Sequence, residues 1–358
     1  MTGPYLNPLH QMTATTPTCL WTDTAGLEEL KTSIAYGAVG ATCNPVIALS
    51  VLKKEAALWT PRTQELLAQL PRATEDEIGW RLVEEMSVRG AGLLRHVFER
   101  DHGRNGRLSI QTDPRNFRDP ERLAAQALHF SQLAPNMIVK IPVTSAGLPA
   151  IEEATYQGVS INATVSFTLP QCMAVAEAVE RGLRRREREG KRVDGMGPVC
   201  TIMVGRIDDW LKVVAAREGV TVDPGSLEWA GVAIFKKTYQ LYRKRGYRLR
   251  LLSAAFRNHL HWSELVGGDV VISPPFEWQT RLNESGISPQ PRMDVPVEPR
   301  ILAELQKLAD FRRSYEEGGL SPAEFDGFGP TRRTLRQFLA ATADLAALVR
   351  DQMVSNPD

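Results

Sequence analysis

Short apolar runs alternate with amphipathic segments along most of this chain, from about residue 18 to residue 286. Many of the runs are rich in β-branched residues, and several are apolar on both faces, as the buried strands of a parallel sheet are. They cover residues 19–23, 40–44, 107–113, 137–143, 159–167, 198–205, 249–256 and 269–275. The segments between them have apolar residues at helical spacing. Four of the helices are expected to end at Gly37, Gly158, Gly182 and Gly246.

Strands that alternate with helices in this way predict an α/β fold, a (β/α)8 TIM barrel of about 250 residues with additions. An open, doubly wound sheet is the alternative architecture. No G-x-G-x-x-G motif follows the first run, and the eight runs favour a closed barrel. We therefore expect a barrel domain over residues 1–290.

Two helical additions to the barrel are expected. Residues 74–101 predict a long helix or a helical hairpin between the second and third strands. After Pro291 the pattern contains no strands and predicts two helical stretches, at 300–317 and at about 331–354. Their apolar residues need a surface to pack on, so residues 291–358 should form a helical extension on the barrel. The same helices would suit a contact in a homo-oligomer.

Composition excludes several classes of partner. The 358 residues are 43% hydrophobic, and 43 Lys and Arg against 42 Asp and Glu leave a net charge of +1, with no basic excess for nucleic acid or an anionic membrane. The charged segment 181–192 contains both signs and reads as a solvated surface. No run approaches the roughly 20 apolar residues of a membrane helix, and the N-terminal segment has no secretory pattern. A cytoplasmic protein is expected.

A metal site is not predicted. Cys19, Cys43, Cys172 and Cys200 are far apart and form no C-x-x-C pair, which is typical of reduced core residues. His259 and His261 would share one face of a strand, but they have no cysteine or carboxylate at ligand spacing.

Lys140 interrupts the apolar run 137–143. A charged amine in a buried strand is costly unless it is paired or neutral, and burial lowers the pKa of a lysine. A free amine of this kind is what a Schiff-base nucleophile requires. In a barrel Lys140 would project inward with Ile138 and Pro142. The alternative is a lysine whose amine reaches solvent from the strand end.

Polar residues also stand at the ends of the other predicted strands, where a barrel brings them to one place. Each has a structural alternative: Asn44 and Asp23 could cap helices, Asp113 could be a turn residue before Pro114, and Thr164 could be an ordinary strand former. Together they favour a shared site. The candidates are Asp23, Asn44, Gln111, Asn162, Thr164, Arg206 and Arg257.

The segment from Asn136 to Ala178 resembles the lysine strand, the following helix and the asparagine/threonine strand of the transaldolase family. WTDT, TCNP, VGRIDDW and AAFRN resemble further motifs of that family, in the same order, so the resemblance runs from about residue 19 to 286. It implies a TIM barrel and transfer of a dihydroxyacetone unit from a ketose phosphate to an aldose phosphate.

The resemblance also implies a role for each residue. Lys140 would form the imine and Asp23 would take the proton of the C4 hydroxyl. Thr164 would position the catalytic water, while Asn44 and Asn162 would hold substrate hydroxyls. Arg206 and Arg257 would bind the phosphate, because two guanidinium groups suit a phosphate. No cofactor is implied, since the lysine imine is itself the electron sink.

The sequence departs from the family pattern at several positions. Gln111 replaces the glutamate that relays protons through water, and an amide cannot accept a proton in that way. Met203 replaces a phenylalanine, Thr201 a serine, and Ala255 a further serine. The related fructose-6-phosphate aldolases also have glutamine at the Gln111 position, but they pair it with a tyrosine at the Met203 position.

Three hypotheses follow from these departures. The first is a transaldolase-like transferase with an altered proton relay or substrate. The second is a Schiff-base aldolase that needs no aldose phosphate acceptor. The third is a barrel that binds sugar phosphate without turnover, against which the retained lysine and aspartate argue. The missing tyrosine places the first hypothesis ahead of the second.

Overall fold

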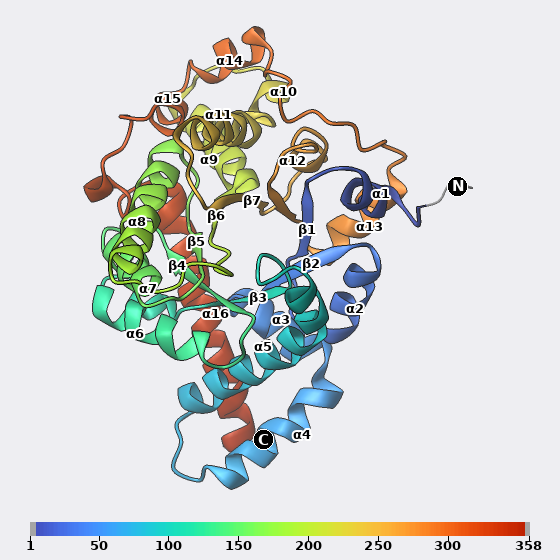
Figure 1. Ribbon diagram of the computed structural model, residues 1–358, viewed down its shortest axis with the longest axis vertical. Coiled ribbons are helices and arrows are strands. Elements are labelled where there is room, and N and C mark those ends of the chain that lie inside the picture. Colours follow the sequence, from blue (N-terminus) through green and yellow to red (C-terminus); the bar gives the residue numbers. More distant parts are fainter. Residues whose placement is uncertain (1–4, 355–358) are drawn as a thin grey trace.

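The computed structural model describes residues 5–354, in which eight parallel strands close a barrel in chain order (Figure 1). β8 pairs with β1 and completes the ring, with Leu20 opposite Ile272. The predicted TIM barrel is therefore confirmed. The strands are β1 (Cys19–Thr22), β2 (Ala38–Thr42), β3 (Arg107–Gln111), β4 (Met137–Pro142), β5 (Ile161–Thr164), β6 (Val199–Met203), β7 (Arg250–Ala254) and β8 (Val271–Ser273).

Each predicted run overlaps one strand. Seven strands are shorter than their runs, and β2 has the length of its run but begins two residues earlier. The largest difference is at β5, where the apolar pattern continues to Phe167 but the strand ends at Thr164. Val165 adopts the left-handed conformation with φ of 57°, and this interrupts the extended chain. A β-branched residue rarely adopts this conformation, so the periodicity of the sequence could not reveal it.

Helices connect the strands and form the outer layer. They are α2 (Leu27–Ala35), α3 (Pro45–Lys54), α4 (Ala56–Gln69), α5 (Glu75–Arg100), α6 (Pro120–Ser131), α7 (Gly147–Tyr156), α8 (Leu169–Arg188), α9 (Val204–Glu218), α10 (Pro224–Leu227), α11 (Ala230–Arg245) and α12 (Leu260–Ser263). Helix α1 (Pro8–Thr15) precedes the barrel and α13 (Phe276–Glu284) follows it. The 3-10 turn η1 (Pro114–Asn116) follows β3. The segment predicted at 74–101 is one continuous helix, α5. Thr74 and Glu77 form a capping box at its start.

Three of the four glycines expected to end helices do so. Gly37, Gly158 and Gly246 follow α2, α7 and α11 with positive φ. The prediction for Gly182 was wrong, because this residue lies inside α8. A Cβ atom at Gly182 would lie 2.6 Å from the carbonyl oxygen of Glu152 in α7, so the glycine permits the close packing of α7 on α8.

The C-terminal segment is helical, as expected. The stretch predicted at 300–317 consists of α14 (Pro299–Leu305) and α15 (Ala309–Tyr315), and after the 3-10 turn η2 (Pro322–Glu324) the final stretch is the long helix α16 (Gly329–Met353). The expected domain limits at residues 1 and 358 lie outside the described residues.

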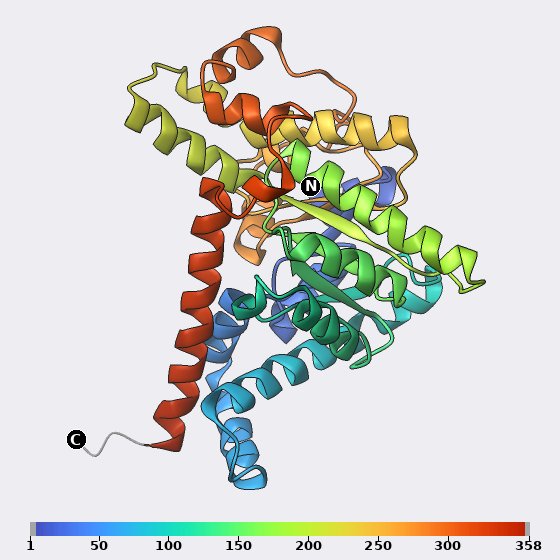
Figure 2. The same ribbon diagram turned by 90° about the vertical axis from the view of Figure 1, so that its left-hand side faces the viewer.

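Helix α16 lies along one end of the barrel, against α3, α4, α5, α9 and η1 (Figure 2). Three of these elements, α3, η1 and α9, begin just after the carboxyl ends of β2, β3 and β6. Helix α16 therefore crosses the end of the barrel at which the active sites of TIM-barrel enzymes lie. No described helix combines the length and the apolar content needed to span a membrane.

Candidate active site

Lys140 lies in β4 with its side chain in the barrel interior, as predicted. Ile138, two residues earlier on the same face, packs with Trp21, Val199 and Leu252 in the lumen. Lys140 is 5% exposed, and its amine has no hydrogen-bond partner among residues 5–354. Burial lowers the pKa of Lys140. The negative charge of Asp23 opposes this shift, and the positive charge of Arg206 adds to it.

Lys236 is another buried lysine, but its amine is hydrogen-bonded. It is 4% exposed, but its amine donates to Glu264 at 2.8 Å and to the carbonyl oxygens of Arg292 and Val295 at 3.0 and 2.8 Å. These contacts satisfy all three hydrogens of an ammonium group. Of these two buried lysines, Lys140 is the one with an amine available for chemistry.

Gln111 and Asn162 are the register partners of Lys140 on β3 and β5. The amide of Asn162 donates to Ser109 Oγ at 3.0 Å and its oxygen accepts from Thr201 Oγ1 at 2.7 Å. Side chains from β3 and β6 thus fix the orientation of Asn162 on β5, and the Thr201 hydroxyl is directed at Asn162. Ser109 was not among the predicted site residues, although it lies two residues before Gln111 on the same face of β3.

Two buried polar atoms beside the lysine strand have no partner in the described part of the chain. They are Oε1 of Gln111 and the hydroxyl of Thr164, which lies opposite Pro142. Buried polar atoms are nearly always hydrogen-bonded, so these two atoms suit contacts with a polar ligand. Met203 adds an apolar surface that is 7% exposed at the end of β6.

Asp23 and Asn44 lie at the ends of neighbouring strands, on the same side as Lys140. Asp23 is half-buried directly after β1, and it accepts a short hydrogen bond from the Thr42 hydroxyl. The Asn44 side-chain oxygen caps α3, accepting from the backbone N–H groups of Val46 and Ile47 at 2.9 and 3.0 Å. The capping interpretation thus holds for the Asn44 oxygen, while its NH₂ group is not used in the cap. Asp23 is not a helix cap, since the N-cap of α2 is Gly26.

Asp113 is a turn residue, as its alternative interpretation proposed. Its carboxylate accepts from the backbone N–H of Arg115 at 2.9 Å and forms an ion pair with the Arg115 guanidinium at 2.7 Å. Asp113 is also the N-cap of η1, which begins at Pro114. This carboxylate is occupied by its own turn and does not replace a relay group near Lys140.

The two candidate phosphate-binding arginines differ in their surroundings. Arg206 lies in the first turn of α9, where burial and the charge of Arg257 lower its pKa, and its Nε has no partner among the described residues. Its Nη2 donates to Gln337 of α16 at 2.6 Å. Arg257 is exposed and forms an ion pair with Asp209 at 2.8 Å. A phosphate bound by both arginines would compete with Asp209.

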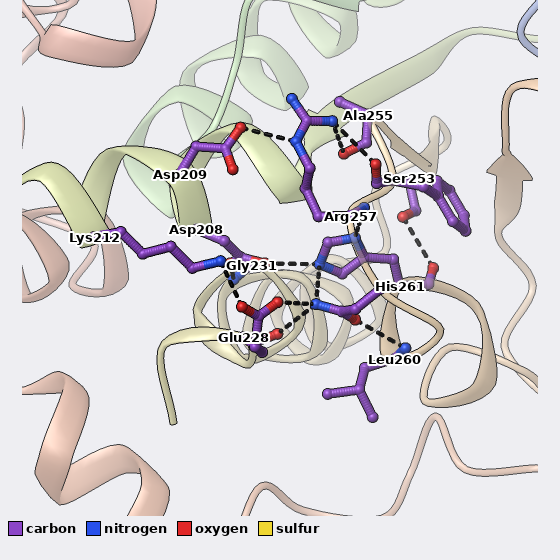
Figure 3. A network of polar contacts seen from close by, with 12 residues as sticks. Asp208, Asp209, Lys212, Glu228, Gly231, Ser253, Ala255, Arg257, Leu260 and His261 are labelled. Carbon is purple, nitrogen blue, oxygen red and sulfur yellow. Dashed lines mark hydrogen bonds and ion pairs between the residues drawn. The ribbon is translucent and has the colours of Figure 1, made fainter. Parts of the chain in front are cut away.

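A buried network holds the backbone that carries Arg257 (Figure 3). The Arg257 N–H donates to Nδ1 of His261 at 3.1 Å, which assigns the ring proton to Nε2, and Nε2 donates to Asp208 at 2.7 Å. The other Asp208 oxygen accepts from the Gly231 N–H at 2.8 Å. Burial raises the pKa of Asp208, and His261 opposes this shift. At the end of β7, Ala255 has φ of 63°, a strained conformation of the kind found at functional sites.

The surroundings of the site differ on its two sides. A groove beside Asp23 is lined by Val46, Ile47, Pro275 and Phe276, between the start of α3 and the end of β8. On the other side Cys43, Asn44 and Gln111 share a small cavity with Trp80, Val83, Thr342 and Leu345, the last two from α16.

In the part of the chain that the structure describes, no three His, Cys, Asp or Glu side chains are grouped to hold a metal ion.

These features define a TIM-barrel protein whose candidate active site centres on a buried lysine, the amine of which has no partner in the described chain. Residues 20–311 match the family Transaldolase/Fructose-6-phosphate aldolase, and the chain belongs to this family. The resemblance inferred from the motifs is confirmed. Helix α16 lies outside the matched residues.

Several transaldolases are similar to this chain. The protein named Transaldolase 1 of Streptomyces avermitilis is 34% identical over 211 residues, which are 58% of this chain and 54% of that protein. The transaldolase of Thermobifida fusca is 34% identical over 191 residues, 51% of each. The match thus spans about half the length of these two relatives. The transaldolase of Parafrankia sp. is 28% identical over 359 residues, covering 90% of this chain and 96% of that protein.

Proposed function

We propose that this protein is a transaldolase-like transferase that moves a dihydroxyacetone unit from a ketose phosphate to an aldose phosphate. The observation that supports this most strongly is the Lys140 amine, which is buried, has a lowered pKa and lacks a partner among residues 5–354. Membership of a family whose relatives are named transaldolases supports the same reaction.

The proposed reaction begins when the Lys140 amine attacks the C2 carbonyl of the ketose and water leaves, which forms a protonated imine. Asp23 takes the proton of the C4 hydroxyl, and the C3–C4 bond breaks as its electron pair moves into the imine. The aldose phosphate departs and an enamine remains on Lys140. The enamine attacks the aldehyde of the acceptor, the new hydroxyl regains the proton from Asp23, and hydrolysis of the imine releases the product.

Other residues would orient the substrate and water. The Thr164 hydroxyl is proposed to position the catalytic water, and its lack of a partner in the described chain supports that role. The amide N–H groups of Asn44, and the second amide N–H of Asn162, have no partner among the described residues and would bind sugar hydroxyls. Arg206 and Arg257 would bind the phosphate.

Borohydride trapping tests the proposal. Incubation with dihydroxyacetone and borohydride should add one reduced three-carbon unit to the intact mass, and peptide mapping should place it on Lys140. Lys236 is the internal control, because it is equally buried but paired, and it should remain unlabelled. An unchanged mass would favour a barrel without turnover and would contradict both enzyme hypotheses.

Gln111 supports the second candidate function, a fructose-6-phosphate-aldolase-like lyase. The amide stands where the transferases have a glutamate, and its oxygen has no partner among the described residues. A panel of ketose phosphates, read by mass spectrometry with and without an aldose phosphate acceptor, separates the two reactions. Products that require the acceptor indicate transfer, whereas release of free dihydroxyacetone without it indicates a lyase.

The proposed phosphate contact predicts a selective effect of Arg206→Ala. Binding of phosphorylated substrates should weaken by roughly 2–4 kcal/mol, while unphosphorylated substrates should be unaffected. Equal losses for both classes would show that Arg206 has a structural role.

A further inference from the structure

Helix α16 covers the candidate site although it lies outside the residues that match the family. Near one end of the crossing, Gln337 accepts the hydrogen bond from Nη2 of Arg206 at 2.6 Å. Further along the helix, Thr342 lines the small cavity that contains Asn44 and Gln111. The helix rises about 7.5 Å between positions 337 and 342. This segment therefore spans the site from Arg206 to Gln111, the strand neighbour of Lys140.

The positive charge of Arg206 is half-buried, with its Nε fully buried, and it has no acidic partner in the described part of the chain. Its guanidinium forms no ion pair within residues 5–354, whereas nearby Arg257 is paired with Asp209. Gln337 offers a neutral oxygen, which orients the guanidinium without neutralising it. A carboxylate at the same place would bind Arg206 more strongly and would compete with an anionic ligand. The Arg206 guanidinium, oriented by a neutral partner, therefore retains a positive charge that can bind an anion.

Two contacts fix the start of α16 near this position. Asp326 accepts hydrogen bonds from the backbone N–H and the hydroxyl of Ser145, in the loop after β4, at 2.8 and 2.6 Å. Gly329 lies so close to Trp210 of α9 that a Cβ atom would come within 2.1 Å of the indole ring. The helix that supplies Gln337 is thus attached both to the loop after the lysine strand and to the helix that carries Arg206.

We propose that Gln337 is a positioning residue, which holds the Arg206 guanidinium in the orientation that binds the phosphate group of the sugar. Helix α16 then sets the preference for phosphorylated over unphosphorylated substrates. This inference rests on the proposed function of Arg206 and deepens it.

Substitutions at Gln337 test the proposal by separating KM from kcat. Gln337→Ala should raise KM for a phosphorylated ketose about 3- to 10-fold, the effect of one lost hydrogen bond, with little change in kcat. KM for dihydroxyacetone as an unphosphorylated donor should not change. Gln337→Glu should raise KM for the phosphorylated ketose further than Gln337→Ala, because a carboxylate neutralises Arg206 and repels phosphate. Gln352→Ala is the control, since Gln352 lies on the same helix and its oxygen has no partner among the described residues.

Binding of inorganic phosphate, measured by calorimetry, separates this proposal from the proposed function. The wild-type protein should bind phosphate, and Gln337→Glu should weaken that binding. If borohydride labels Lys140 but phosphate binding and KM are the same in all variants, the role of Gln337 is overturned. If phosphate binding weakens in Gln337→Glu but Lys140 is not labelled in the wild type, the role of Gln337 stands and the transferase reaction is overturned. Equal changes for phosphorylated and unphosphorylated donors would also contradict the proposal.

Discussion

Thr201 donates the hydrogen of its hydroxyl to Oδ1 of Asn162 at 2.7 Å, between two neighbouring strands of the barrel. Asn162 is the register partner of Lys140, and its amide also donates to Ser109 at 3.0 Å. The side chain beside the lysine is therefore oriented by the neighbouring strand β6 and by β3, on the other side of the lysine strand. Thr201 supports the site by holding Asn162.

Thr201→Val should destabilise the protein and impair substrate binding. Valine has nearly the shape of threonine but cannot donate, so the buried oxygen of Asn162 loses its partner, which costs about 1–3 kcal/mol. Urea denaturation and steady-state kinetics measure the two effects. Thr201→Ser is the control, because it keeps the hydroxyl. If the valine and serine variants behave alike, the hydrogen bond has no role in the site.

The pH dependence of imine formation should respond to the charges around Lys140. Arg206 lowers the pKa of Lys140 and Asp23 raises it. Arg206→Met should therefore raise the pKa and move the acid limb of the labelling rate to higher pH, and Asp23→Asn should move it to lower pH. The rate of borohydride labelling with dihydroxyacetone at a series of pH values measures these shifts. Dihydroxyacetone has neither the phosphate that Arg206 would bind nor the C4 hydroxyl that Asp23 would deprotonate. Shifts in the same direction would show that the lysine does not respond to these two charges.

Lys140→Met should raise the free energy of unfolding at neutral pH, by an amount on the order of 1 kcal/mol. The folded-state pKa of Lys140 lies below its unfolded value of about 10.4, so the unfolded chain binds more protons between the two values. The stability of the wild type should rise with pH in that window, and the advantage of the methionine variant should shrink and vanish above it. Chemical denaturation at a series of pH values measures the difference. An advantage that does not depend on pH would contradict the lowered pKa.

Gln111→Glu should raise transferase turnover and change its pH profile. The glutamate restores a titratable group beside the imine, and general acid–base catalysis contributes roughly 10²–10⁴-fold where it operates. We expect an increase of about tenfold, measured by product formation across a pH series. Gln111→Met, which has a similar length but no titratable group, should not show it. Activity at background level in the glutamate variant would mean that the amide has a role of its own.

Glycine-to-alanine substitutions in two helices should have opposite effects on stability. Gly92 in α5 has open space where a Cβ would lie, so Gly92→Ala should stabilise the protein by about 0.5–1 kcal/mol. Gly182→Ala in α8 gains the same propensity but places its methyl group 2.6 Å from the Glu152 carbonyl oxygen, so it should destabilise the protein. Thermal unfolding of the pair distinguishes helix propensity from packing. A gain in stability in both variants would show that α7 and α8 separate without penalty.

The sequence by itself determined the barrel and the members of its candidate site. Strand periodicity is local, and residues at the carboxyl ends of successive strands must meet once the barrel closes, so Lys140, Gln111 and Asn162 could be grouped before the fold was seen. The inward direction of Lys140 followed from the alternation of residues along one strand.

The tertiary structure decided how these residues are partnered, because that depends on contacts between segments far apart in the chain. Periodicity does not show that Thr201 holds Asn162, that Asp209 pairs with Arg257, or that Gly182 lies in a helix interior against α7. The contact of Gln337 with Arg206 joins residues 131 positions apart. An exposed glutamine on an amphipathic helix carries no local signal of such a contact. Only the path of α16 across the barrel brings it to the site.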